Sequence, residues 1–132
     1  WSTYSAFDGC TNLKTVTYLG TLAQWCALNG GGYLISVVDA SQVTMSDGTD
    51  LKTMTNLVIP NGVERIGYYA FYKRENLTSV TIPASVTGIG RDAFSNCTSL
   101  AEVTYLGTEE QWNAIEGIDK SGLSGKTITF AP

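Results

Sequence analysis

Histidine is missing from all 132 residues of the chain. Its absence excludes the Ser-His-Asp and Cys-His catalytic machineries and the usual histidine-ligated zinc catalysts. Cysteine is scarce as well: there are three, an odd number, which cannot form a closed set of disulfides. The sequence therefore predicts no cofactor and no metal ligands, and it leaves only carboxylate chemistry open to an enzyme.

Basic residues are few, with eight Lys and Arg against twelve Asp and Glu and a formal net charge of −4. A nucleic-acid surface usually carries a basic stripe, so we expect no nucleic-acid partner. No apolar run approaches the roughly 18 residues of a membrane span, so we expect no membrane insertion. The length and the 43% hydrophobic content fit one domain over residues 1–132. Because the chain opens with Trp1 and not Met, we interpret it as a fragment of a longer protein.

The chain is repetitive, and this is its most informative property. MTNLVIPNGVERIG begins at position 54 and LTSVTIPASVTGIG at position 77, and the two align without gaps. The two full copies share mostly apolar or backbone-special residues: Thr55/Thr78, Ile59/Ile82, Pro60/Pro83, Val63/Val86, Ile66/Ile89, Gly67/Gly90, Ala70/Ala93 and Phe71/Phe94. A fixed period of this length is typical of a solenoid in which stacked repeats share one core.

A longer unit is duplicated as well. AFDGCTNLKTVTYLGTLAQW at 6–25 and AFSNCTSLAEVTYLGTEEQW at 93–112 agree at 13 of 20 positions, at a constant offset of 87. Thr21 and Thr108 each precede a Gln by three positions, which is the spacing of a helix capping box. We therefore expect a short capped helix in each copy, with Trp25 and Trp112 mostly buried.

The repeat follows the pattern A-F-x-x-C-x-x-L-x-x-V-x-I-P-x-x-V-x-x-I-G, supplied by Ala93, Phe94, Cys97, Leu100 and Val103 and, from the preceding copy, by Ile82, Pro83, Val86, Ile89 and Gly90. This pattern resembles the BspA-like class of bacterial leucine-rich repeats, and the element T-Y-L-G-T-x-x-Q-W is similar to a unit found in those proteins. The resemblance implies a β-rich, right-handed leucine-rich-repeat solenoid with short helices, in a secreted or cell-surface bacterial protein. It also implies protein binding or adhesion to host components, since some members bind host extracellular-matrix proteins.

Residues 29–50 break the repeat period and form an irregular insert. Here we expect a strand over residues 43–45 and a hairpin turn at Asp47-Gly48. Residues 51–59 are expected to form the second arm of this hairpin. The insert matches the C-terminal capping unit 100–132 loosely, Val43 with Ile128 and Met45 with Phe130, so each TYLGT unit is expected to finish in a strand.

The cysteines are interpreted as small buried hydrophobes. Cys10 and Cys97 share one repeat position but lie at least three rungs apart, at about 4.8 Å per rung, which is too far for a disulfide. Cys26 follows Trp25 on the first short helix, and few cations are available there to lower its pKa.

The central repeat departs from the pattern, because Arg74 stands where Cys10 and Cys97 stand in other copies. A buried unpaired Arg is costly, so we expect this turn to swing outward or Glu75 to pair with Arg74. Such a charge patch on a loop is most simply a solvated one. Aromatic residues flank it, however, and aromatic plus Arg is the composition of interface anchors. The candidate partner-binding residues are Tyr68, Tyr69, Tyr72, Lys73 and Arg74.

Other candidates have structural explanations. A carboxylate pair, as in glycosidases, could come from Asp92, Glu102, Glu109 and Glu110, but the last two fit the first turn of a helix. Asp47 and Asp50 could hold Ca²⁺ weakly, although a plain turn explains them. The outward strand positions are mainly hydroxyl-bearing, which stacked strands favour by themselves; they are Lys14, Thr15, Thr17, Thr55, Asn56, Val58, Thr78, Ser79, Thr81, Ala101, Glu102 and Thr104.

The sequence therefore predicts a non-enzymatic repeat scaffold that binds a host or extracellular protein. The alternative is a passive spacer or terminal cap of a larger repeat array, and a carboxylate-pair glycoside hydrolase is the third reading. A monomer is favoured.

Overall fold

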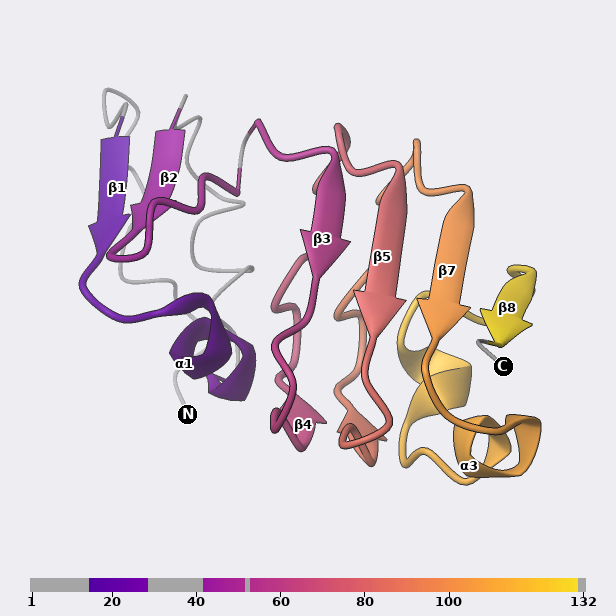
Figure 1. The fold of residues 1–132 in the computed structure, drawn as a ribbon. Helices are drawn as coiled ribbons and strands as arrows, with labels where there is room; N and C mark the ends of the chain where they lie inside the picture. The colour runs from indigo at the N-terminus through magenta and orange to yellow at the C-terminus, as the bar shows by residue number, and fades with distance from the viewer. Residues whose placement is uncertain (1–14, 29–41, 52, 131–132) are drawn as a thin grey trace.

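The chain folds as a stack of parallel strands in a computed structural model that describes residues 15–28, 42–51 and 53–130. Most of the strands lie side by side in chain order, as Figure 1 shows. The elements are β1 (Thr15–Tyr18), α1 (Leu22–Ala27), β2 (Gln42–Met45), β3 (Asn56–Val58), β4 (Arg65–Ile66), β5 (Ser79–Ile82), β6 (Gly88–Ile89), β7 (Glu102–Tyr105), α3 (Glu109–Asn113), the 3₁₀ helix η1 (Ile118–Lys120) and β8 (Ile128–Phe130).

The strands pair in the register that the repeat predicts. β3, β5, β7 and β8 form one parallel sheet, in which Leu57 is opposite Val80 and Val80 is opposite Val103. In each of these pairs, the two residues are one repeat apart in the sequence. β4 and β6 pair in parallel with the same displacement. One repeat is therefore one rung, and identical sequence positions lie above each other.

The core is a column of the repeated apolar residues. Phe71 and Phe94 are 0% and 1% exposed, and their rings stack with centroids 5.4 Å apart and planes 20° from parallel. Ala70 and Ala93 beside them are also buried, so this side of the coil forms one wall of the core. Complete burial of a large apolar side chain stabilises a fold by about 1.5–3 kcal/mol.

The side of the coil that carries Phe71 and Phe94 has its own hydrogen-bond ladder. The amide of Phe71 donates to the carbonyl of Ala93 at 2.8 Å, and the amide of Lys73 donates to Ser95 at 3.0 Å. Phe94 continues the ladder to the carbonyl of Ser121 at 2.8 Å. The turns on this side are therefore fixed rung to rung, although they are not strands.

The helices of the two TYLGT units begin in the same way. Both helices begin at a capping box, since Gln24 and Gln111 donate their amides to Thr21 and Thr108 while their side chains accept from the threonine amides. Trp25 and Trp112 are 4% and 8% exposed, which confirms their predicted burial. Trp25 and Trp112 pack edge-on against Tyr18 and Tyr105 respectively, with centroids 5.3 Å apart in each case.

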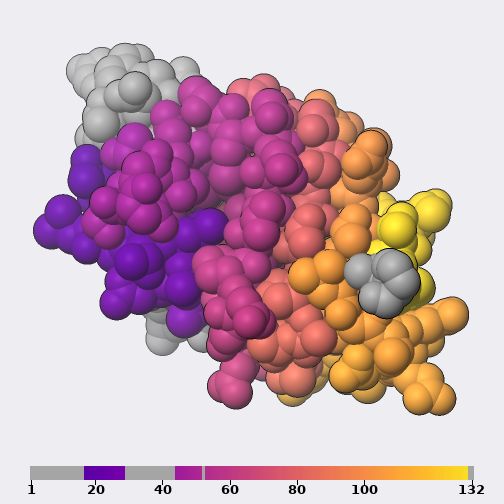
Figure 2. Space-filling model, viewed as in Figure 1, coloured from indigo at the N-terminus to yellow at the C-terminus, as the bar shows by residue number. Residues whose placement is uncertain are grey.

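Each unit also closes with a strand. β2 pairs in parallel with β1, placing Val43 opposite Val16, and β8 pairs with β7, placing Ile128 opposite Val103. The correspondence of Val43 with Ile128 is thus confirmed. Figure 2 shows the successive parts of the chain as adjoining bands across one face.

The hairpin expected over 43–59 is wrong. β2 pairs in parallel with β1, and the only antiparallel contact found in the described part of this segment is one bridge between Thr44 and Asp50. The next strand, β3, begins at Asn56 and pairs in parallel with β5. The turn chemistry at Asp47-Gly48 is real, with Gly48 at φ 91°, but a turn fixes only a local reversal and not the partner of the following strand.

Candidate functional site

The candidate residues lie on the turn after β4, on the side of the coil that carries Phe71 and Phe94. We call residues 68–76 the central turn and residues 91–99 the next turn, which is the same segment one repeat later. Tyr68 is 45% exposed and Lys73 is exposed, while Tyr69 and Tyr72 are half-buried. The indole of Trp25 on α1 donates to the carbonyl of Ala70 at 2.8 Å and holds one end of this turn.

Two residues of the central turn have a left-handed backbone. Tyr69 has φ 58° and Lys73 has φ 59°. Their counterparts one repeat later are Asp92 at φ 57° and Asn96 at φ 61°. Asp and Asn accept this conformation readily, whereas Tyr and Lys do so at a cost. The central turn therefore carries strain that the next turn avoids with the same backbone.

The side chains of Tyr69, Tyr72 and Lys73 contact one another. The rings of Tyr69 and Tyr72 pack edge to face, with centroids 5.2 Å apart and planes at 89°. Lys73 places its Nζ 5.5 Å from the centroid of the Tyr72 ring, within the range of a cation–π contact. The three side chains form one ordered surface, which lowers the entropy lost on binding.

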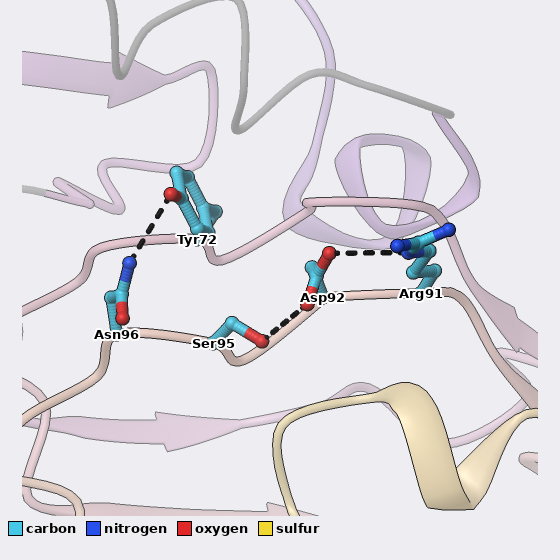
Figure 3. A network of polar contacts seen from close by, with 5 residues as sticks. All are labelled: Tyr72, Arg91, Asp92, Ser95 and Asn96. Carbon is cyan, nitrogen blue, oxygen red and sulfur yellow. Dashed lines mark hydrogen bonds and ion pairs between the residues drawn. The ribbon is translucent and has the colours of Figure 1, made fainter.

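The next turn supports this surface with polar side chains, as Figure 3 shows. Asn96 Nδ2 donates to the Tyr72 hydroxyl at 3.2 Å. Asp92 accepts from Ser95 Oγ at 2.7 Å and faces Arg91 Nε at 3.5 Å. Burial and then the charge of Asp92 raise the pKa of the Tyr69 phenol, so this hydroxyl remains protonated at neutral pH.

Arg74 does not lie where the sequence reasoning placed it. The turn does not swing outward, and no ion pair with Glu75 forms within the part of the chain that the structure describes; Arg74 is buried at 4% exposure. Its Nε donates to the carbonyl of Tyr72 at 3.1 Å. The solvated charge patch is therefore wrong for Arg74, because the ladder keeps every turn in the same place whatever its side chains. Of the other candidates, Tyr69, Tyr72 and Lys73 lie in contact with one another, and Tyr68 is an exposed residue of the same turn.

The repeats match those of a known protein family. A family model for the BspA type leucine rich repeat region matches residues 49–116, with six copies. The chain belongs to this family. The match confirms the resemblance carried by the repeat pattern.

One solved structure is similar to part of the chain. It is the crystal structure of a leucine rich cell surface protein from Faecalibacterium prausnitzii, with 31% sequence identity over 84% of this chain and a TM-score of 0.49. The chain covers 31% of that protein and so spans less than a third of its length. No curated protein matches the chain.

The hydroxyl-bearing outer face of the BspA-type repeats has internal partners. Ser79 Oγ donates to Asn56 Oδ1 at 2.7 Å, and Thr78 Oγ1 donates to the carbonyl of Thr55 at 2.9 Å. Both bonds join consecutive repeats at the same repeat position. The polar groups of this face thus stabilise the stacking of the rungs, which is the structural role expected from the sequence.

The carboxylates singled out in the sequence are spread over separate elements of the fold. Glu109 and Glu110 lie in the first turn of α3, where they favour the helix dipole. Glu102 lies on β7, and Asp92 is occupied by Ser95 and Arg91. No cluster of three acidic or cysteine ligands suited to a metal occurs in the described residues.

The Asp47 turn joins two elements. Asp47 accepts from the amide of Leu22 at 3.2 Å and from the amide of Thr49 at 3.1 Å. These bonds lower the pKa of the Asp47 carboxyl. The carboxylate therefore anchors the turn to the first residue of α1, as a structural turn requires.

The described cysteines are structural. Cys26 and Cys97 are free and buried, and burial raises the pKa of Cys26 to about 12. Cys97 Sγ lies 3.1 Å from the carbonyl of Phe71. Cys10 and Lys14 lie outside the described residues. None of the helices that the structure describes has the length and apolarity to cross a bilayer.

Sequence reasoning missed the left-handed positions and the support from the next turn. A signal for both was present, since Tyr69 and Lys73 align with Asp92 and Asn96 at the repeat period. Asp and Asn at two positions of a turn indicate left-handed backbone there, and the repeat transfers that backbone to every other copy.

Proposed function

We propose that this chain is a non-enzymatic repeat scaffold of a secreted or cell-surface bacterial protein, and that it binds a host or extracellular protein through the central turn. The repeat scaffold follows from the family match to residues 49–116. The binding role rests on the contacting side chains of Tyr69, Tyr72 and Lys73 and on the exposed Tyr68 of the same turn. It is a proposal about this chain alone and not about a longer parent protein.

The observation that carries the proposal is the ordered aromatic and cationic surface. Tyr69 and Tyr72 are in ring contact, and Lys73 lies over Tyr72. Interface hot spots are enriched in Tyr and Arg, and residues already held in place lose little entropy on binding. Tyr69 and Lys73 also hold strained backbone, and strain in a folded protein is concentrated at functional positions.

The proposal includes the finer features of the architecture. We take the coil to be right-handed, as crossover connections between parallel strands are. Residues 1–132 then form one leucine-rich-repeat domain, with an irregular insert over 29–50 and a C-terminal capping unit over 100–132. The acidic balance of the chain supports a partner other than nucleic acid, and a monomer remains the favoured state.

The test is binding of the purified chain to a panel of host matrix proteins and glycans. We expect saturable binding to a matrix protein, weakened roughly tenfold or more in the double variant Tyr68→Ala/Tyr72→Ala. Val58→Ala is the matched control, because Val58 is 55% exposed on β3, away from the central turn. Circular dichroism checks that each variant is folded.

Two other outcomes would contradict the proposal. Equal binding by the wild type and the double variant would move the site off the central turn. A folded chain that binds no member of the panel would favour the passive spacer or terminal cap of a larger repeat array.

A further inference from the structure

Arg74 replaces an apolar residue in an interior column of the coil. The same repeat position is held by Leu51 one rung earlier and by Cys97 one rung later. Leu51, Arg74 and Cys97 are 1%, 4% and 4% exposed. A permanently charged guanidinium therefore lies in a position that its neighbours keep neutral.

The guanidinium is incompletely paired. Its Nε donates to the carbonyl of Tyr72 at 3.1 Å. Its Nη1 is buried and has no hydrogen-bond partner within the described residues. Burial lowers the pKa of Arg74, as expected for a charged group that is taken out of water. Buried polar groups without a partner are rare, and each calls for a physical explanation.

The surroundings offset the burial of this charge only in part, because the charge of Glu75 raises the pKa of Arg74 by less than burial lowers it. Burial raises the pKa of the Cys97 thiol, so Cys97 is neutral at physiological pH. Glu75 is exposed and forms no ion pair with Arg74 within the described part of the chain. Lys73 adds a second positive charge beside Arg74.

A hollow lies beside the guanidinium. It has a volume of about 200 Å³ and is lined by Leu51, Lys73, Arg74, Glu75 and Asn76. Lys73, Glu75 and Asn76 are exposed, and exposed side chains change rotamer rapidly. Arg74 itself lines the hollow, which has room for a single small acidic group.

We propose that this hollow binds a carboxylate, which pairs with the guanidinium of Arg74. Arg and carboxylate form two parallel hydrogen bonds, and such pairs are stronger than neutral ones. A carboxylate supplies both the acceptor that Nη1 lacks and the charge that the column lacks. The inference rests on the proposed function in one respect: the carboxylate belongs to an Asp or Glu side chain of the extracellular protein partner.

The experiment follows the Nε–H signal of Arg74 by ¹H–¹⁵N NMR while a small acid is added to the full chain. The first probe is N-acetyl-glutamate α-amide, which has one side-chain carboxylate, and its neutral isostere N-acetyl-glutamine α-amide is the control. Glucuronate tests an acidic sugar as the source of the same chemistry. We expect a saturable shift with the glutamate probe and none with the glutamine probe.

Three variants decide which group binds. Arg74→Leu restores the residue type of Leu51, so the column stays filled, and binding followed on neighbouring backbone amides is expected to weaken about ten- to hundredfold. Arg65→Leu removes the same charge from a half-exposed side chain and is expected to leave binding unchanged. Glu75→Gln removes the carboxylate that lines the hollow and is expected to bind the probe equally or more tightly.

The inference is overturned if neither the wild type nor Glu75→Gln binds an acid, or if Arg65→Leu weakens binding as much as Arg74→Leu. A shift with glucuronate alone supports the carboxylate site but overturns a protein as its source. Binding of the glutamate probe without binding of any matrix protein supports this inference and leaves the proposed function without support. Binding of a matrix protein that Arg74→Leu does not weaken supports the proposed function and overturns this inference.

Discussion

Lys73 holds a left-handed backbone at φ 59°, in a position where the next repeat has Asn96 at φ 61°. This conformation costs a non-glycine residue about 1–2 kcal/mol, and it costs Asn less because its short side chain bonds locally. The same backbone is thus supported by a suitable residue in one copy and by an unsuitable one in the other. The repeat therefore provides its own reference for strain at a single residue.

We predict that Lys73→Asn raises the free energy of unfolding by about 1 kcal/mol, because it relieves this strain. Urea denaturation of the two chains measures the change. Lys73→Ala is the control, since it removes the charge and the contact with Tyr72 but keeps an unsuitable residue at φ 59°. A variant with Asn no more stable than the variant with Ala would show that no strain is stored there.

Arg74 is a second residue whose chemistry does not suit its position in the repeat. Its chemistry argued for an exposed position, and the repeat argued for a buried one, because Leu51 and Cys97 flank it in the column. The repeat prevailed, since the amides of Phe71 and Lys73, which precede Arg74 in the turn, are both bonded to the next rung. One costly side chain does not displace a turn that is fixed by several backbone hydrogen bonds.

At the scale of the element, a close backbone contact between rungs occurs at Gly90. A Cβ added there would lie 2.5 Å from the amide nitrogen of Tyr68 and 2.7 Å from the carbonyl carbon of Gly67. Both are backbone atoms that cannot rotate away. The glycine is therefore required by contact between consecutive rungs, as the repeated Ile-Gly pair indicated.

We predict that Gly90→Ala lowers the free energy of unfolding by about 1–3 kcal/mol through overpacking. Gly88→Ala, at the start of β6 in the same rung, is the matched control, because its Cβ would meet the end of the flexible Arg65 side chain at 2.8 Å. Thermal and urea unfolding measure both. Equal losses in the two variants would contradict a backbone contact specific to Gly90.

At the scale of the whole molecule, β3, β5 and β7 belong to rungs that are related by one displacement. Asn56 pairs with Ser79 and Ser79 pairs with Glu102, so each pairing spans one repeat. Removal of one complete repeat therefore returns every remaining partner to register. In such coils, stability is approximately the sum of rungs and of their neighbour contacts.

We predict that deletion of residues 77–99 gives a shorter chain that still unfolds cooperatively, at a lower urea midpoint. Deletion of residues 77–98 is the control, because an offset of one residue turns the core side chains of the following strand to the opposite face. Circular dichroism and tryptophan fluorescence follow both chains. Cooperative unfolding of the control to the same extent would contradict a fold determined by register.

The sequence by itself determined the features that recur along the chain. The rung spacing, the inward Phe71 and Phe94 and the two capping boxes were readable, because periodic patterns and short-range caps record local geometry directly. The partner of β2 and the burial of Arg74 were decided only by the tertiary structure. Both depend on contacts between rungs, where backbone pairing and the shared core outweigh the preference of a local turn or of one side chain.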